Sequence, residues 1–212
     1  MSLVHVAPTE TTVEGGGHAK GVAVAVVREN KDNTGMARVK VSYPWHESGQ
    51  QSYWARVVAP MAGKQRGIYF LPEVGDEVLV AFDRGDVRFP YVIGALWNGV
   101  DKAALDNSDG KNDVRQIRTR KGHKLTFDDG SKGLVQLELN DGRRLTFKDD
   151  LVELVDGQGN TLAFKSDSGE VTLEAKSKLI LKATQVLVDA SGTAEVKAGG
   201  TLTLRGTTVN IN

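Results

Sequence analysis

Acidic side chains are the first residues of this sequence that could do chemistry, because two neighbouring carboxyl groups can share general acid and general base work. They occur in three close pairs: Asp83/Asp86, Asp128/Asp129 and Asp149/Asp150. Each pair stands beside glycine or at the end of an apolar run, where Asp is favoured for local hydrogen bonding in turns. No histidine, serine or further acid completes a site around them, so the sequence favours turns over a hydrolase dyad.

Histidine and cysteine offer no metal centre. The four histidines are scattered at His5, His18, His46 and His123, and the chain contains no cysteine. None of the histidines has the spacing of metal ligands, and no phosphate-binding loop or dinucleotide fingerprint is present. We therefore expect no metal, no cofactor and no enzymatic activity.

Aromatic and basic residues form a third candidate site. Tyr43, Trp45 and Trp54 are interleaved with Arg38, Lys40 and Arg56. On a small barrel, this combination could stack the bases of single-stranded nucleic acid. However, the 27 basic residues are balanced by 27 acidic ones, whereas nucleic-acid binders usually carry a basic excess. We expect the aromatic residues to form the barrel core and rim, with the cations on its outer face and no nucleic-acid partner.

Alternating apolar residues predict the element that must hold those aromatic side chains. Five short strand-like runs follow one another in residues 18–100: GVAVAVVREN, ARVKVSY, SYWARVVAP, DEVLVAFD and FPYVIGALW. Turn residues such as DNTG and DRGD separate them. Five strands in this length predict a small antiparallel barrel of the OB type.

The N-terminal residues 1–17 are polar and end in three glycines, which predicts a flexible arm. They lack the layout of a secretory signal, so we expect synthesis in the cytoplasm without a signal peptide. The sequence also has no apolar run of 18 residues, the length needed for a transmembrane helix.

A second, thinner all-β region follows the barrel. Residues 101–120 are polar and are predicted to be a linker, and residues 121–212 are predicted to form an elongated β-shaft. Phe127, Phe147 and Phe164 recur in the related runs HKLTFDDG, RRLTFKDD and TLAFKSDSG. Asp-Gly and Gly-Asn turns between them are typical of hairpins.

Within residues 178–212, pairs of aliphatic residues repeat every seven or eight residues. The pairs are Leu179/Leu181, Val186/Val188, Ala194/Val196, Leu202/Leu204 and Val209/Ile211. A fixed period of this kind indicates a repeat architecture. We call each eight-residue repeat an octad. Burial of its apolar side chains stabilises the fold by only about 3–6 kcal/mol, whereas ordering its backbone costs about 8–16 kcal/mol.

That deficit falls if several identical chains wrap around one axis and share their apolar side chains. We therefore predict an intertwined homo-oligomer, of which a three-sided prism is the simplest closed form. The residues predicted to form the trimer axis core are Leu173, Leu181, Val188, Val196, Leu204, Val209 and Ile211.

Three segments carry a family resemblance: GMARVKVSYPW, SYWARVVAPMAGKQRGIYFLPEVGDEVLVAFDRGD and FPYVIGALWNG. They resemble the OB domain of the central spike of contractile injection machines. That family comprises baseplate assembly protein V of phage tails and the valine-glycine-repeat spike of type VI secretion. TRKGHKLTFDD and the octads are similar to its shaft, so the resemblance covers about residues 18–212.

The resemblance implies a homotrimer in which an OB-fold barrel is followed by a triple-stranded β-helix. Such a needle would pierce a target membrane transiently. It would meet hub, baseplate and tail-tube proteins at its OB end, within a phage tail or secretion particle. It would also carry a small tip protein with proline-alanine-alanine-arginine repeats, docked on Thr207, Thr208, Val209, Asn210, Ile211 and Asn212.

The sequence departs from the family in three respects. A hub-like N-terminal domain is missing, so we expect a separate hub subunit or one outside this sequence. No lysozyme-like domain lies between barrel and shaft, and the iron-binding His-x-His of some phage spikes is absent. The alternative from another class is an OB-fold binder of nucleic acid or glycans with a β-rich oligomerisation tail.

Overall fold

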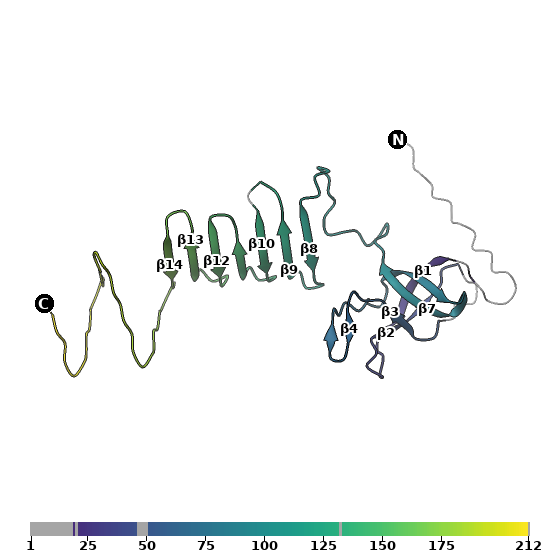
Figure 1. Cartoon of the computed structure of the whole chain (residues 1–212), viewed down its shortest axis with the longest axis horizontal. Helices are drawn as coiled ribbons and strands as arrows, with labels where there is room; N and C mark the ends of the chain where they lie inside the picture. Colours follow the sequence, from purple (N-terminus) through teal and green to yellow (C-terminus); the bar gives the residue numbers. More distant parts are fainter. Residues whose placement is uncertain (1–18, 20, 46–50, 132, 212) are drawn as a thin grey trace. The chain divides into compact units, whose positions relative to one another are not determined.

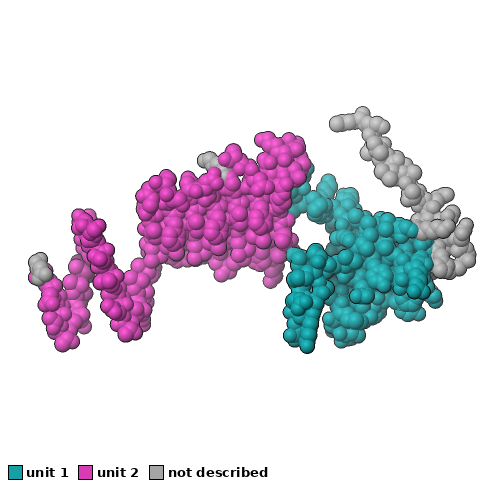
Figure 2. Space-filling model, in the orientation of Figure 1, with its two compact units in different colours: residues 1–106 teal, residues 107–212 magenta. Residues whose placement is uncertain are grey.

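The computed structural model describes residues 19, 21–45, 51–131 and 133–211. Every regular element in this described part is a β-strand. The chain divides into two compact units, residues 1–106 and residues 107–212, which Figure 2 colours separately. The predicted flexible N-terminal segment at 1–17, together with His5, His18, His46 and Asn212, lies outside the described residues.

The first unit contains a closed barrel whose strands follow the order β1-β2-β3-β7-β6 (Figure 1). Its strands are β1 (Val22–Glu29), β2 (Arg38–Ser42), β3 (Ala55–Val57), β6 (Glu77–Asp83) and β7 (Asp86–Ala95). All pairings are antiparallel except β3 with β7, which is parallel and closes the barrel. These are the five strands that the alternating runs predict, so the OB-type barrel is confirmed.

Small aliphatic residues fill the barrel, because alternate residues of each strand point inward. The fully buried side chains include Ala25, Val27, Val39, Val41, Ala55, Val78, Val80 and Val92. Tyr43 closes one side of this core, and burial raises the pKa of its hydroxyl group. That hydroxyl donates a 2.7 Å hydrogen bond to the carbonyl oxygen of Val87. The polar atom of Tyr43 therefore has a hydrogen-bond partner inside the protein.

An ion pair fastens the loop between β1 and β2. The Asp32 carboxylate accepts hydrogen bonds from Arg38 Nε at 2.8 Å and from Arg38 Nη2 at 3.0 Å. It also accepts bonds from the backbone N–H and the hydroxyl of Thr34. Only 3% of the Asp32 side chain is exposed. These donors, Arg38 foremost, hold the pKa of Asp32 far below its ordinary 3.8.

Replacing Asp32 is expected to destabilise the barrel in a pH-dependent way. Because the pKa is lowered in the folded state, the ionised carboxylate stabilises the barrel at every pH above the unfolded pKa, near 3.8. The melting temperature of Asp32→Asn should therefore lie below that of the parent at pH 7, and the gap should shrink as the pH falls below about 4.

Tryptophan fluorescence measures this melting selectively, since Trp45, Trp54 and Trp97 all belong to the first unit. Asp83→Asn is a suitable control, because Asp83 is exposed. A gap that stayed the same from pH 7 to pH 3 would contradict this role of Asp32.

The second unit begins with a single antiparallel sheet in which seven strands follow in chain order. The strands are β8 (Val114–Arg118), β9 (Lys124–Asp128), β10 (Leu134–Glu138), β11 (Arg144–Phe147), β12 (Leu151–Val155), β13 (Thr161–Lys165) and β14 (Glu170–Glu174). The hairpins turn at Asp129-Gly130, Asp141-Gly142 and Gly159-Asn160, as the sequence predicts.

This sheet starts earlier than the sequence predicts, because β8 lies inside the stretch 101–120 that was assigned to a linker. The strand VRQIR carries three polar residues, which is why composition alone suggested a linker. Its position is set by pairing, since Ile117 lies opposite Leu125 and Gln116 lies opposite Thr126. The linker is therefore confined to the residues before Val114.

Candidate functional site

One face of the seven-stranded sheet is almost wholly apolar. Its residues form two rows that run across all seven strands. The first row is Arg115, Phe127, Val135, Phe147, Val152, Phe164 and Val171, and the second is Ile117, Leu125, Leu137, Leu145, Leu154, Leu162 and Leu173. Arg115 is their only charged member. We call this surface the apolar sheet face.

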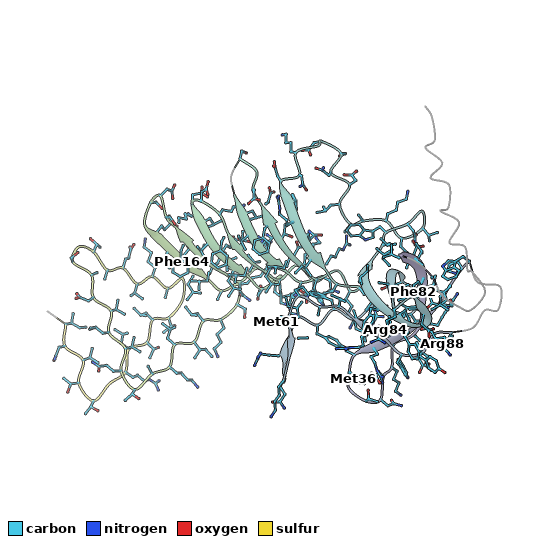
Figure 3. All side chains as sticks on the ribbon, turned by 45° about the vertical axis from the view of Figure 1, so that its right-hand side comes forward. Met36, Met61, Phe82, Arg84, Arg88 and Phe164 are labelled. Atoms are coloured by element: carbon cyan, nitrogen blue, oxygen red, sulfur yellow. The ribbon has the colours of Figure 1, made fainter. Side chains whose placement is uncertain are left out.

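The apolar sheet face is open in a single chain. Phe127, Phe147 and Phe164 are 43%, 45% and 43% exposed, and Figure 3 labels Phe164. Leu154 and Leu173 are more exposed still, at 51% and 54%. A sheet normally buries its apolar face against another layer, and large exposed apolar patches mark interaction sites. The apolar sheet face therefore has the character of a surface that packs against another layer.

The opposite face carries most of the polar side chains, together with Val114, Leu134, Leu151, Val155 and Ala163. Gln116 donates to the hydroxyl of Thr126, and Gln136 donates to that of Thr146, each at 3.0 Å. Cross-strand ion pairs join Lys124 to Glu138 at 3.3 Å, Arg144 to Glu153 at 3.0 Å and Lys165 to Glu170 at 2.9 Å. Paired charges of this kind suit a surface in contact with water, so the two faces of the sheet have different environments.

Residues 175–211 continue from β14 as extended chain that runs back and forth (Figure 1). No strand pairing joins this segment to any other described residue. Its aliphatic side chains are open, with Leu181 69%, Val188 82%, Val196 74% and Leu204 65% exposed. The structure places the predicted axis residue Leu173 on the apolar sheet face, and it does not bring the other six together within one chain.

The predicted tip-docking residues lie at the end of this segment. Thr207, Thr208, Val209, Asn210 and Ile211 are all exposed, with Val209 50% and Ile211 85% accessible. They therefore present both apolar and amide side chains on a surface that no other described part of the chain covers.

The three carboxylate pairs lie in turns or at the strand ends beside them. Asp83 and Asp86 flank the turn at Arg84-Gly85, and Asp86 forms an ion pair with Arg88 at 2.7 Å. Asp128 accepts a hydrogen bond from the backbone of Gly130 at 2.9 Å, and Asp129 contacts Arg115 at 3.1 Å. Asp149 and Asp150 occupy the turn between β11 and β12.

His123 has a structural contact of its own: its Nδ1 accepts a 3.2 Å hydrogen bond from the backbone of Asn140. The described residues contain no group of three or more His, Asp or Glu that could hold a metal ion. No helix in that same part of the chain is long and apolar enough to cross a membrane.

The aromatic–basic site is divided between the two sides of the barrel wall. Tyr43 and Trp45 pack against the core with their ring centroids 5.0 Å apart. Trp54 lies outside, with Lys40 Nζ at 4.8 Å and Arg38 Cζ at 5.6 Å from its ring centroid. A cavity of about 520 Å³ includes Lys40, Tyr43, Tyr53, Trp54 and Arg88 in its lining.

The cations beside the Trp54 ring or in the cavity lining already have acidic partners. Lys40 is paired with Glu29 at 2.8 Å, Arg38 with Asp32 at 2.8 Å and Arg88 with Asp86 at 2.7 Å. Phosphate binding depends on cations that are free to replace counterions. The arrangement therefore supports a structural role for these residues more than a nucleic-acid groove.

Besides strand β8, two features of the structure were not predicted from the sequence. Apart from Leu173, the leucine row of the apolar sheet face was not predicted, although the alternation in HKLTF and RRLTF indicates it. The short hairpin formed by β4 (Ala62–Gly63) and β5 (Arg66–Gly67) was also missed, because two-residue strands have no periodicity to detect.

Comparison with known proteins identifies the barrel. Residues 23–97 match the family model described as the type VI secretion system/phage-baseplate injector OB domain. The chain is similar to the actin cross-linking toxin VgrG1 of Vibrio cholerae, with 30% identity over 169 residues, which is 74% of this chain and 15% of that protein.

Two further relatives are named as spikes. The type VI secretion system spike protein VgrG3 of Vibrio cholerae is 35% identical over 106 residues, 46% of this chain and 10% of that protein. The spike protein VgrG1a of Pseudomonas aeruginosa is 38% identical over 65 residues, 29% of this chain and 10% of that protein. The chain thus spans only 10% to 15% of the length of these relatives.

Proposed function

We propose that the chain is a member of the spike family of type VI secretion systems and phage baseplates, which its matches support, and that it is the central spike of a contractile injection machine. In this role it forms a homotrimeric needle at the baseplate and pierces the target membrane. The observation that carries the proposal is the apolar sheet face, two apolar rows wide and left open in one chain.

The dimensions of the sheet favour three copies. Most of its strands have five residues, which makes each about 17 Å long. Three walls of that width, closed into a triangular prism, lie about 5 Å from the axis, which is half the roughly 10 Å between packed sheets. The leucine, valine and phenylalanine side chains of three sheets then fill the interior.

Other copy numbers fit less well. Four walls of the same width would lie about 8.5 Å from the axis, too far for the side chains to meet across it. Two sheets could pack face to face, but the flanks of their core would stay open to water. A prism of three also matches a sheet that is polar on its outer side.

Residues 178–211 extend this prism as strands that pair between chains. In one chain their backbone has no pairing partner among the described residues, and their small aliphatic pairs cannot repay the cost of ordering the segment. Winding three chains around one axis supplies both the hydrogen bonds and the second apolar layer. The closed arrangement also leaves no free sheet edge.

Hydrogen exchange of the full chain tests this intertwining. We expect the backbone amides of residues 178–211 to be as strongly protected as those of β9 to β13, because each is bonded to a neighbouring chain. Peptides from the barrel provide an internal reference within the same sample. Exchange of residues 178–211 at the rate of an unstructured peptide would contradict the proposal.

The C-terminal end of the shaft is where we place the tip protein. Residues Thr207 to Asn212 from three chains would form a blunt end with the exposed Val209 and Ile211 at its centre. A small protein with proline-alanine-alanine-arginine repeats is the proposed occupant. Hub, baseplate and tail-tube proteins would bind the barrel end, and no cofactor or nucleic acid takes part.

Removing residues 207–212 is expected to abolish binding of the tip protein and leave the trimer intact, because most of the octads remain. Co-purification with a tip protein encoded beside the spike measures the effect. The paired variant Lys197→Ala, placed on the shaft away from its end, should keep full binding. Retention of the tip protein by the truncated chain would place the docking site elsewhere.

The assembled shaft would act mechanically. Paired strands and a closed apolar core resist bending, so the force of sheath contraction reaches a small area of the target membrane. Synthesis in the cytoplasm and later incorporation into an injection particle fit this role. The relatives named as type VI secretion system spike proteins support it.

A further inference from the structure

A projecting hairpin in the first unit forms a separate two-stranded sheet that pairs with no other described strand. In Figure 1 the β4–β5 hairpin stands away from the barrel strands, and Figure 3 marks Met61, the residue just before β4. All residues from 61 to 70 are exposed. We call residues 61–70 the arm.

The shape of the arm is set by its backbone. Ala62 pairs with Gly67 and Gly63 pairs with Arg66, so Lys64 and Gln65 form a two-residue turn. Gln65 has a left-handed backbone with φ of 53°. A side chain at Gly67 would bring its Cβ to 2.6 Å from the carbonyl oxygen of Met61, which requires glycine there.

The arm has a cationic tip and an apolar root. Lys64 and Arg66 stand at the tip, and neither forms an ion pair with another described residue. At the root, Met61 is 50%, Tyr69 71% and Phe70 66% exposed. An isolated two-stranded hairpin is marginally stable in water, so the arm needs a surface to pack on.

The same unit contains a cavity with the complementary chemistry. It has a volume of about 500 Å³, and Asp76, Glu77, Trp97, Val100, Asp101 and Lys102 are among the residues that line it. We call it the acidic pocket. Trp97 is 76% and Val100 is 88% exposed. None of the three carboxylates forms an ion pair with another described residue, and Lys102 offsets only one of their charges.

We propose that, in the trimer, the arm of each chain docks into the acidic pocket of the next chain. This inference rests on the proposed homotrimer. In a ring of three identical chains, every interface joins one surface patch of a chain to a different surface patch of its neighbour. The arm and the acidic pocket are such a pair, because one projects and is basic while the other is hollow and acidic.

The contacts follow from the chemistry of the two surfaces. Lys64 and Arg66 would meet the carboxylates of Asp76, Glu77 and Asp101, while the face of Trp97 receives a cation over its ring. The apolar root of the arm would cover Val100 and the rest of the Trp97 side chain. Three such contacts tie the barrels into a collar that does not depend on the shaft alone.

The natural absence of cysteine makes a direct cross-linking test possible. We expect the double variant Gln65→Cys/Val100→Cys of the full chain to form disulfide-linked dimers and trimers on mild oxidation. Gln65→Cys alone and Val100→Cys alone should remain uncross-linked, because each interface joins the arm of one chain to the pocket of another. Non-reducing gel electrophoresis provides the readout.

A matched control uses Gln65→Cys/Met36→Cys, since Met36 is 59% exposed and does not line the pocket. This pair should give no covalent trimer. In the cross-linking variant, reversing the tip with Lys64→Glu/Arg66→Glu should slow the reaction about tenfold, the size expected of close charge pairs across an interface. Adding Glu77→Lys/Asp101→Lys should restore the rate.

The native mass of each variant separates two kinds of failure. A trimer in which Gln65→Cys/Val100→Cys stays uncross-linked would overturn the docking of the arm and leave the spike proposal standing. Such a result would also arise if the arm served a separate hub protein. A monomeric parent chain would overturn both.

Discussion

Leu173→Asp is expected to abolish the trimer. Leu173 ends the leucine row of the apolar sheet face and is 54% exposed in a single chain. The substitution is therefore mild for one chain, yet it would place three carboxylates at one level of the trimer core. Leaving a charge buried without a partner costs about 3–5 kcal/mol, and here that cost arises in each of three chains. Size-exclusion chromatography with light scattering should report monomers at micromolar concentration.

The neighbouring residue provides the control. Thr172 lies on the same strand but faces the polar side, where its hydroxyl donates to Glu170 at 2.8 Å. Thr172→Asp introduces the same charge at the surface, where such contacts amount to less than about 1 kcal/mol. We expect this variant to stay trimeric. If Leu173→Asp also remained trimeric, the apolar sheet face would not be the trimer core.

Val196→Asp is expected to have an effect of similar size further along the shaft. Val196 belongs to the octad pairs, and 74% of its side chain is exposed in the single chain. If the octads wind around a common axis, the substitution brings three like charges together without water to screen them. The trimers should then be lost or should dissociate on mild heating, as measured by gel electrophoresis of unheated and heated samples.

Lys197→Asp tests the phase of the repeat. Lys197 follows Val196 and points the other way in an extended chain. Its ion pair with Glu195, at 2.9 Å, joins two exposed side chains, so its loss should change little. Equal heat sensitivity of the two variants, or none in either, would show that the inward positions of the octads are misassigned.

The barrel was predictable because its strands follow the simplest rule of sheets. Inward residues alternate with outward ones, and the inward ones are small and aliphatic, as Val39/Val41 and Val78/Val80 illustrate. Each run is bounded by Gly or Asp turns. Trp54 was expected with Tyr43 and Trp45 in the core and rim, but it lies outside the core cluster with Arg38 and Lys40 over its ring.

The second unit could be predicted only in part. The recurring phenylalanines indicated hairpins, but the two complete rows depend on register, which pairs Leu137 with Leu145 and Leu154 with Leu162. Strand β8 was not predicted because its two arginines and one glutamine interrupt the alternation of apolar residues. The contacts of Leu181, Val188 and Val196 involve other chains in the proposed trimer, so a single chain places those side chains in solvent.

Native mass spectrometry of the full chain tests the central claim most directly. We predict one dominant species with three times the 22.9 kDa mass of the chain, persisting at micromolar concentration and at high salt because its core is apolar. A chain that stays monomeric under these conditions, with its apolar sheet face still open to water, would contradict the account.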